Sequence, residues 1–299
     1  MEYYDLRFHR GRRPAFGKVP AAARRRIFGV DYVLVQGLQG GDLYFTRAGW
    51  AVADSLLPMH WYDNERFCRV GRALTAGTGS VYRVPVPHRA RGSLAVVVKF
   101  CRFGQDVGVL DGGGGDVFPW SEAVQADAEF LGPFAEFGRV EELRRSLGPG
   151  RWFGLKRPLA IYCPSVRFLR WQLGRNPSRD WCHDRPLAAD QAAEGAKAVR
   201  HDWERLYILL YQWIDGVDAQ EAFEDGLIDA ATLTGLARRS ARDLAAAGFA
   251  VLDHKPRHVI VRPTADGLVS RRGVPVYAII DYELLVPYRP AAGGAGVQG

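Results

Sequence analysis

Residues 94–100 place the strongest constraint on how this chain can fold. They read Leu-Ala-Val-Val-Val-Lys-Phe, a continuous apolar run that is rich in β-branched residues and is interrupted only by Lys99. Such a run is typical of a buried β-strand. Residues 81–86, shortly before it, alternate in side-chain character with a period of two, which predicts a second strand. The two segments therefore predict a β-hairpin in which a buried strand carries one lysine.

A glycine-rich segment leads into this hairpin. Gly77 and Gly79 lie in the sequence Ala-Gly-Thr-Gly-Ser, directly before Val81. Glycine allows backbone N–H groups to approach a ligand such as a phosphate closely. We interpret the whole stretch 67–100 as β structure, including residues 67–70 ahead of the glycines. Further upstream, Thr46 is predicted to cap the start of a short helix.

The C-terminal part of the chain predicts one helix followed by three short strands. Asp229 can cap a helix over residues 230–247 that ends at Gly248. The apolar runs after it cover residues 249–252, 259–261 and 276–280. Asp253 follows the first run and Asp281 follows the last, so both aspartates are predicted at strand ends. Together with the hairpin, these elements predict a mixed α+β fold.

The composition narrows the class of protein. The 299 residues are 47% hydrophobic and 24% charged, so the chain can bury a core without disulfides or a structural metal. Its four cysteines show no metal-ligand spacing, which predicts reduced thiols and a cytoplasmic protein. No apolar run approaches the ~18 residues of a membrane span, and the N-terminal segment does not resemble a signal peptide. The net charge of +7 suits anionic partners such as nucleotides, whereas no sequence-specific nucleic-acid motif is seen.

Five motifs, in this order, resemble those of the protein-kinase-like superfamily. The glycines before Val81 resemble a contracted glycine-rich loop, and Val-Val-Val-Lys, ending at Lys99, is similar to Val-Ala-Ile-Lys. Trp-Ile-Asp-Gly at residues 213–216 resembles the hinge of aminoglycoside-type and lipopolysaccharide-type kinases. Asp-His-Lys-Pro-Arg-His at residues 253–258 resembles the catalytic loop Asp-x-Lys-Pro-x-Asn. Ile-Ile-Asp-Tyr-Glu at residues 279–283 resembles the metal-binding Asp-Phe-Gly segment or, in small-molecule kinases, Asp-x-Glu.

The resemblance implies a two-lobed, protein-kinase-like α+β fold and a phosphotransferase activity. Residues 67–212 would form an N-lobe with an antiparallel sheet and an insertion, and residues 213–299 a shortened, mostly helical C-lobe. Residues 1–66 would be an N-terminal extension, and the sequence leaves its role open. The implied reaction depends on ATP and Mg²⁺ and moves the γ-phosphate to a hydroxyl of an acceptor, either a small molecule or a protein.

The resemblance also implies a role for individual residues. Gly77 and Gly79 would contact phosphates, Lys99 would hold the α- and β-phosphates, and Trp213 would lie at the hinge beside the adenine. In the catalytic loop, Asp253 would be the catalytic aspartate and Lys255 would contact the γ-phosphate. Asp281, together with His258, would hold the Mg²⁺.

An acidic partner for Lys99 is expected from the helix that follows it. The candidates are Glu129, Glu136 and Glu141. We favour Glu136, because Phe137, Val140 and Leu143 give its helix an apolar side that can pack on a sheet.

Three departures from the family pattern keep other interpretations open. His258 stands where the metal-binding asparagine is expected, and Val251 stands where a histidine usually precedes the catalytic aspartate. Only 18 residues follow Asp281, since 299 minus 281 is 18, which leaves no room for peptide-binding helices. These departures favour, as the alternative, a pseudokinase that acts as a nucleotide-binding or regulatory module. A basic nucleic-acid-associated protein is a third interpretation, and it predicts strongly salt-dependent duplex binding.

Overall fold

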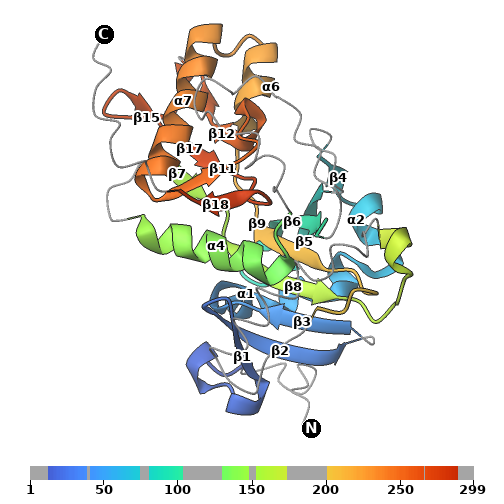
Figure 1. Ribbon diagram of the computed structural model, residues 1–299. Helices are drawn as coiled ribbons and strands as arrows, with labels where there is room; N and C mark the ends of the chain where they lie inside the picture. The colour runs from blue at the N-terminus through green and yellow to red at the C-terminus, as the bar shows by residue number, and fades with distance from the viewer. Residues whose placement is uncertain are drawn as a thin grey trace. The chain divides into compact units, whose positions relative to one another are not determined.

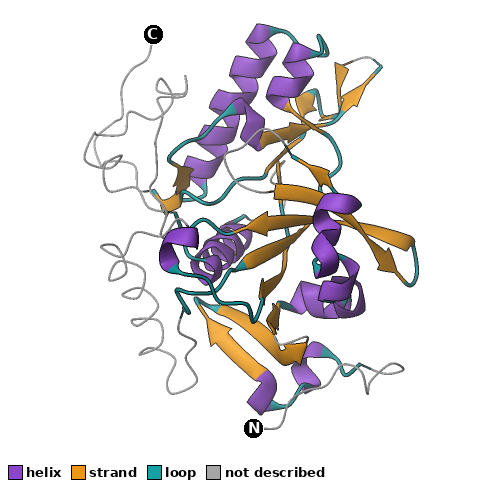
Figure 2. Cartoon of the chain, turned by 90° about the vertical axis from the view of Figure 1, so that its right-hand side faces the viewer, coloured by secondary structure: helices purple, strands orange, loops and turns teal. Residues whose placement is uncertain are grey.

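The computed structural model describes residues 13–38, 41–74, 81–103, 130–147, 153–173, 201–265 and 267–288. The chain divides into two compact units. The first holds the described residues of Met1–Asp106, Glu129–Gly138 and Lys156–Trp213, and the second holds those of Arg139–Leu155 and Ile214–Gly299. Figure 2 shows that helices and strands both contribute, so the predicted mixed α+β class is confirmed.

The first unit is built on one antiparallel sheet of eight strands (Figure 1). From one edge to the other, its strands are β1 (Arg24–Ile27), β2 (Val30–Leu38), β3 (Gly41–Phe45), β8 (Pro158–Cys163), β9 (Ile208–Gln212), β6 (Gly92–Phe100), β5 (Val81–His88) and β4 (Arg72–Ala73). Every neighbouring pair in this order is antiparallel. Residues 24–45, whose role the sequence left open, therefore supply three strands of the same sheet.

The predicted hairpin is confirmed as β5 and β6, which pair from Val81 opposite Lys99 to His88 opposite Gly92. Val96 and Val98 on β6 are fully buried and belong to a core on one face of the sheet. Val97, which points to the opposite face, is also fully buried. A strand that is covered on both faces requires a continuous apolar run rather than an alternating one.

Residues 46–61 cover one face of this sheet. They form α1 (Arg47–Ala51) and two 3₁₀ helices, η4 (Ala53–Leu56) and η5 (Pro58–His60). Trp50, Leu56 and Trp61 from this segment are buried in the same core as Val96 and Val98. As predicted, Thr46 caps α1, since its Oγ1 accepts a hydrogen bond from the Gly49 N–H at 3.1 Å.

The other face of the sheet receives the start of helix α4 (Pro133–Ser146). The ring of Phe134 lies 5.0 Å from that of Tyr44 in an edge-to-face arrangement, and the ring of Phe137 lies 5.0 Å from that of Tyr211. Phe134 and Phe137 are both fully buried. These contacts fix which side of α4 faces the strands.

The prediction of β structure for residues 67–70 is wrong, because α2 (Arg66–Arg69) is a short helix. Asn64 and Glu65, in the preceding 3₁₀ helix η6 (Asp63–Glu65), have positive φ angles of 52° and 54° and redirect the chain just before α2. The helical turn brings the Phe67 ring within 5.1 Å of the Phe100 ring on β6. Four residues with one partly buried aromatic side chain fit a helix as well as a strand, so periodicity alone could not decide between them.

The second unit contains a four-stranded sheet, a two-stranded sheet and two helices. The four strands are, in spatial order, β10 (Val217–Asp218), β12 (Val259–Val261), β17 (Tyr277–Ile279) and β7 (Phe153–Leu155). The two-stranded sheet pairs β11 (Phe249–Val251) with β18 (Leu285–Pro287). The helices are α6 (Ala219–Glu224) and α7 (Ala230–Ala246).

The predicted elements of the C-terminal part are confirmed. Helix α7 begins after Asp229, whose carboxylate accepts a hydrogen bond from the Thr232 N–H at 2.8 Å, and Gly248 follows its end with a φ of +84°. Strands β12 and β17, which come from the second and third of the predicted apolar runs, pair antiparallel. Between them lie two small ribbons, formed by β13 (Pro263–Thr264) with β14 (Gly267–Leu268) and by β15 (Ser270–Arg271) with β16 (Val274–Pro275).

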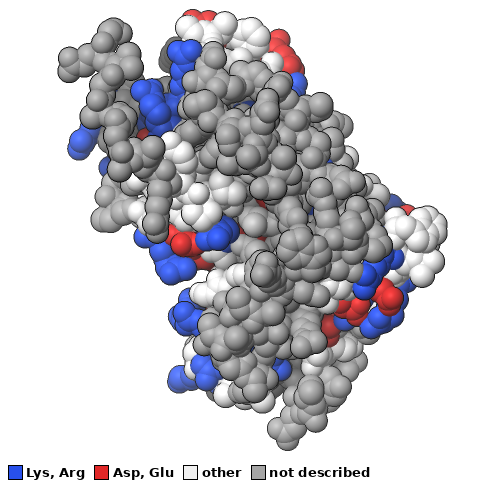
Figure 3. All heavy atoms as spheres, viewed as in Figure 1, with Lys and Arg blue, Asp and Glu red and all other residues white. Residues whose placement is uncertain are grey.

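Three further 3₁₀ helices complete the described secondary structure: η2 (Phe16–Lys18), η3 (Ala21–Ala23) and η7 (Arg170–Leu173). None of the helices in the described ranges is long and apolar enough to cross a membrane. On the face shown in Figure 3, the described Lys and Arg side chains stand in several separate groups, some of them beside Asp and Glu, rather than in one continuous basic patch.

Candidate functional site

In the first unit, the structure brings Lys99 and Glu136 together as a buried ion pair. Lys99 Nζ lies 2.9 Å from Glu136 Oε1 and 3.1 Å from Oε2. Lys99 is 5% exposed and Glu136 is 1% exposed. Strand β6 therefore presents Lys99 to the glutamate of α4 that the sequence analysis favoured. Two charges this deeply buried are tolerated only when each has a partner.

Tyr211 completes this buried group, and sequence analysis did not identify it. Its hydroxyl donates a hydrogen bond to Glu136 Oε1 at 2.6 Å, and the residue is 1% exposed. On β9, Leu209 pairs with Lys99 of β6, so Tyr211, two residues along, shares the face of the sheet from which Lys99 projects. The alternation of side chains along β9 was the available signal, but it is informative only once the pairing of β6 with β9 is known.

A second lysine lies beside the same tyrosine. Lys156 is 6% exposed, and its Nζ lies 5.8 Å from the centre of the Tyr211 ring. A cation over an aromatic face is attracted by the ring quadrupole. The buried group in the first unit thus contains one carboxylate with a lysine and a tyrosine hydroxyl on it, and another lysine against the tyrosine ring.

In the second unit, Asp253 lies in the loop after β11, two residues beyond the last residue of that strand. Lys255 Nζ lies 3.3 Å from Asp253 Oδ2, and the Asp253 side chain is 21% exposed. Burial raises the pKa of Asp253 above its ordinary value, and the neighbouring Asp281 raises it further, while His258 and Lys255 act in the opposite direction.

His258 and Asp281 meet at the ends of two paired strands. His258 ends the 3₁₀ helix η9 (Pro256–His258), which starts at a proline, and leads directly into β12. Asp281 comes two residues after β17, the strand paired with β12. Because Ile280 N–H donates to the His258 carbonyl at 3.1 Å, the two segments are tied together at this end. His258 Nε2 lies 3.4 Å from Asp281 Oδ2.

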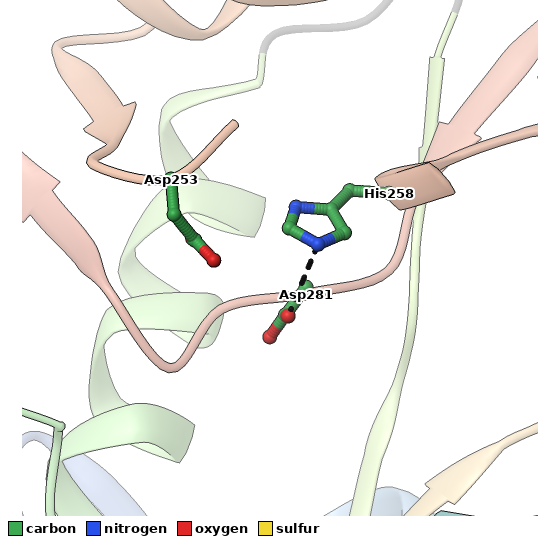
Figure 4. Close-up of side chains that lie close together, drawn as sticks. All are labelled: Asp253, His258 and Asp281. Atoms are coloured by element: carbon green, nitrogen blue, oxygen red, sulfur yellow. Dashed lines mark ion pairs between the residues drawn. The ribbon is translucent and has the colours of Figure 1, made fainter. Parts of the chain in front are cut away.

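The donor atoms of Asp253, His258 and Asp281 fit one divalent cation. One atom from each side chain can be chosen so that all three lie within 4.8 Å of one another. Three ligands at about 2.1–2.3 Å from a common ion lie about 3–4 Å from one another, so the side chains would have to move closer together by up to about 1–2 Å to bind it. Figure 4 shows the imidazole of His258 with the carboxyl groups of Asp253 and Asp281 on two sides of it. Two carboxylates and one imidazole therefore form a possible metal centre within one unit.

Three contacts hold the segments that carry these ligands. His254 Nε2 and Ser240 Oγ on α7 are 2.7 Å apart, and burial lowers the pKa of His254 to about 4. On the other side, the buried hydroxyl of Tyr282 donates to the Ile279 carbonyl, and the Glu283 N–H donates to Asp281 Oδ1 at 3.3 Å. Sequence analysis did not assign any role to His254 or Tyr282. The partner of His254 is a serine on another element, and the partner of Tyr282 is a backbone carbonyl.

Of the remaining predicted site residues, the structure describes Trp213 but not the two glycines. Gly77 and Gly79 lie outside the described residues, but Leu74 N–H donates to the Val81 carbonyl across that segment, and β4 pairs with β5. Trp213 donates its backbone N–H to the Ala95 carbonyl at 3.3 Å. The ring of Trp213 lies 4.7 Å from the guanidinium carbon of Arg83.

Of the two other glutamates considered for Lys99, the structure describes one. Glu141 forms an ion pair with Arg144 on the same helix at 3.4 Å. Glu129 lies outside the described residues. Among the candidates, Glu136 is thus the one that the structure places on Lys99.

Searches of family models, curated proteins and solved structures found no match to this chain. The functional argument therefore depends on the geometry of its own residues.

Proposed function

We propose that this chain is an ATP-dependent phosphotransferase of protein-kinase-like organisation that moves the γ-phosphate to a hydroxyl of an acceptor. The observation that carries the proposal is the cluster of Asp253, His258 and Asp281, with Lys255 on Asp253. These residues come from two segments at the ends of paired strands, and they supply a metal centre and a carboxylate for the acceptor hydroxyl. Phosphoryl transfer needs this combination, because its catalysis is mostly positioning and charge neutralisation.

The first unit supports the same proposal. Counting from the strand before the glycine-rich segment, β4, β5 and β6 are successive antiparallel strands, and Lys99 is near the end of the third. The following helix supplies Glu136 to that lysine. In protein kinases, a lysine on the third strand pairs with a helix glutamate and with nucleotide phosphates. The same arrangement of elements in this chain favours a phosphate-binding role for Lys99.

Each residue then has a defined task. Asp253 orients the acceptor hydroxyl and accepts its proton, and Lys255 steadies the Asp253 carboxylate and contacts the transferred phosphate. Glu136 and Tyr211 hold the Lys99 ammonium in place for the other phosphates. Asp281 and His258 would hold a divalent metal, which would supply positive charge to neutralise the transferred group.

A test of the proposal measures ADP release from ATP by the purified full chain, with a divalent metal and pooled hydroxyl-bearing acceptors. Asp253→Asn should lower the rate by about 10²–10⁴-fold, the usual contribution of a positioned acid or base. Asp225→Asn is the matched control, because Asp225 is exposed at the end of α6 and lies outside the cluster. Equal rates for Asp253→Asn and the unmodified protein would contradict the assigned role.

One observation favours the alternative of a pseudokinase. His258 Nε2 already lies 3.4 Å from Asp281 Oδ2, so a protonated His258 can satisfy Asp281 without a metal. If the His258–Asp281 pair only stabilises the fold, the chain would bind nucleotide weakly, or bind it without transferring the phosphate. Under that alternative, His258→Asn should raise phosphoryl transfer by freeing Asp281 for the metal. Under the main proposal, His258 is a working metal ligand. His258→Asn should then lower the rate of phosphoryl transfer measured with the metal that the protein prefers.

A further inference from the structure

The candidate metal centre contains an imidazole as well as carboxylates. His258, Asp253 and Asp281 each offer one donor atom within 4.8 Å of the others. Carboxylate oxygens suit Mg²⁺, Ca²⁺ and Mn²⁺, whereas an imidazole nitrogen suits first-row transition cations. Mg²⁺ is bound in proteins through oxygen ligands and gives up its water reluctantly, so a nitrogen donor adds little to its binding. The donor set is therefore better matched to a transition cation than to Mg²⁺.

The backbone fixes the position of this imidazole. The His258 N–H donates to the Lys255 carbonyl at 2.9 Å, and the His258 carbonyl accepts from Ile280 at 3.1 Å. The side chain of His258 is only 13% exposed. Since both backbone groups are engaged and the ring is mostly buried, the imidazole is held beside Asp281 rather than free to turn into solvent.

The polar atoms of the ring are oriented for a ligand role. Nε2 faces the Asp281 carboxylate at 3.4 Å, while Nδ1 is buried and makes no hydrogen bond among the described residues. Asp281 Oδ1 accepts from the Glu283 backbone, which leaves Oδ2 turned toward the imidazole. Figure 4 shows that Asp253 approaches the ring from another side. The three side chains therefore bring one imidazole nitrogen and two carboxylates to the same place.

We propose that His258 and Asp281, beside Asp253, bind a first-row transition cation, with Mn²⁺ as the test case, in preference to Mg²⁺, and that His258 sets this preference. The assignment of this ion to phosphoryl transfer rests on the function proposed above, but binding of the metal alone does not. The expected affinity order follows the general series for mixed nitrogen and oxygen sites, in which Zn²⁺ and Co²⁺ bind more tightly than Mn²⁺.

The test is titration calorimetry of Mn²⁺, Co²⁺ and Mg²⁺ into the full chain without nucleotide, supported by electron paramagnetic resonance of free Mn²⁺. One Mn²⁺ should bind per chain, and Mg²⁺ should compete poorly. Loss of a residue that hydrogen-bonds to a metal ligand costs about 10–100-fold in metal affinity. Loss of the imidazole itself in His258→Asn should therefore weaken the binding of Mn²⁺ and Co²⁺ by at least that much. The affinity for Mg²⁺ should change little. Asp281→Asn should weaken all three metals. His88→Asn, a change to a histidine of the first unit, is the matched control and should leave binding unchanged.

Outcomes that overturn the proposal are clear. Equal Mn²⁺ affinity in His258→Asn and the unmodified protein would remove His258 from the site, and no Mn²⁺ binding at millimolar concentration would reject the site itself. If His258→Asn failed to fold by circular dichroism, His258→Gln and Asp281→Asn would carry the same comparison. Selective Mn²⁺ binding without ADP release in any metal would keep this inference and reject the phosphotransferase. Conversely, Mg²⁺-supported turnover that is indifferent to His258 would keep the phosphotransferase and reject this inference.

Discussion

At the scale of single residues, the Tyr211 hydroxyl adds a hydrogen bond to the buried carboxylate of Glu136 beside the ion pair with Lys99. A hydrogen bond to a charged group contributes about 1.5–3 kcal/mol to stability, and here the 2.6 Å bond is fully buried. We predict that Tyr211→Phe lowers the free energy of unfolding by that amount, measured by urea denaturation. Tyr62→Phe is the control, since Tyr62 is a partly buried tyrosine that packs against the core on the other face of the sheet, and loss of its hydroxyl should cost less than about 0.5 kcal/mol. Equal effects in the two variants would contradict the account.

The Lys99–Glu136 pair should show strong energetic coupling. Removing one partner leaves a buried charge without compensation, so Glu136→Leu or Lys99→Met alone should cost about 3–5 kcal/mol. In the double variant both charges are gone, and much of this loss should be recovered. A double-mutant cycle in guanidinium chloride measures the coupling. Additive losses would show that the pair does not act as a unit.

Sequence analysis could single out several candidate site residues because their local patterns are informative. Lys99, Asp253 and Asp281 each stand in or next to an apolar strand, and Glu136 lies on a helix with an apolar side. Their proposed roles came from the resemblance of the motifs around them. Tyr211 could not be recognised in this way, because its role depends on which strand lies next to β6. The contribution of His254 was equally hidden, since it depends on a serine on α7.

At the scale of elements, helix α1 packs so closely on β8 that only glycine fits at one position. A Cβ on Gly49 would lie 1.8 Å from the Leu159 carbonyl oxygen, whereas a Cβ on Gly235 in α7 would meet no atom within 4 Å. Gly49→Ala should therefore destabilise the protein by about 1–3 kcal/mol or more through overpacking against backbone. Gly235→Ala should stabilise it by roughly 0.5–1 kcal/mol, the usual helix preference of alanine. Thermal unfolding of the two variants measures both, and a stable Gly49→Ala protein would contradict the packing.

The contact between α7 and the Asp253 loop should make stability fall in acid. Burial and the nearby His258 lower the pKa of His254 to about 4 in the folded chain, against about 6.5 when unfolded. Between these values the unfolded chain binds a proton that the folded chain does not, so stability decreases as the pH falls from about 6.5 toward 4. At about 1.4 kcal/mol per pKa unit, the loss amounts to roughly 3 kcal/mol. Denaturation from pH 7 to 4 should be less pH-dependent in His254→Gln, and an unchanged slope would contradict this assignment.

The elements that were predicted correctly have strong local signals. The β5–β6 hairpin has a continuous β-branched strand, and α7 has an aspartate cap and a terminal glycine. The elements that were missed depend on non-local pairing. The strands within residues 24–45 join the sheet through β8, more than a hundred residues later in the chain, and no local pattern announces that pairing. The short helix α2 was missed because four residues carry too little periodicity.

At the scale of the whole molecule, several described arginines are engaged in ion pairs rather than left to form a nucleic-acid surface. Arg13 pairs with Asp54, Arg205 with Asp42, and Arg167 with both Asp202 and Glu204. Neutralised arginines contribute less to binding of a polyanion. The net charge of +7 is therefore a weaker argument for nucleic acid than it is for a small anionic ligand such as a nucleotide.

Each of the two units holds one part of the proposed chemistry. The first contains the buried Lys99, Glu136 and Tyr211 group, and the second contains the cluster of Asp253, His258 and Asp281 with Lys255. The central claim is that this chain binds a nucleotide together with a divalent metal. Each of the two groups should then be tested for its own effect on nucleotide binding.

Thermal unfolding with and without ATP plus Mn²⁺ or Mg²⁺ tests this claim most directly. A ligand at ~100 times its Kd stabilises the folded chain by about 2.7 kcal/mol, which is visible as a rise in melting temperature. The account predicts a metal-dependent rise that is lost in both Lys99→Met and Asp281→Asn, and kept in Lys18→Met, a control at an exposed lysine of the first unit. Absence of a rise with any nucleotide, or a rise that survives in both site variants, would contradict the nucleotide site and with it the proposed phosphotransferase.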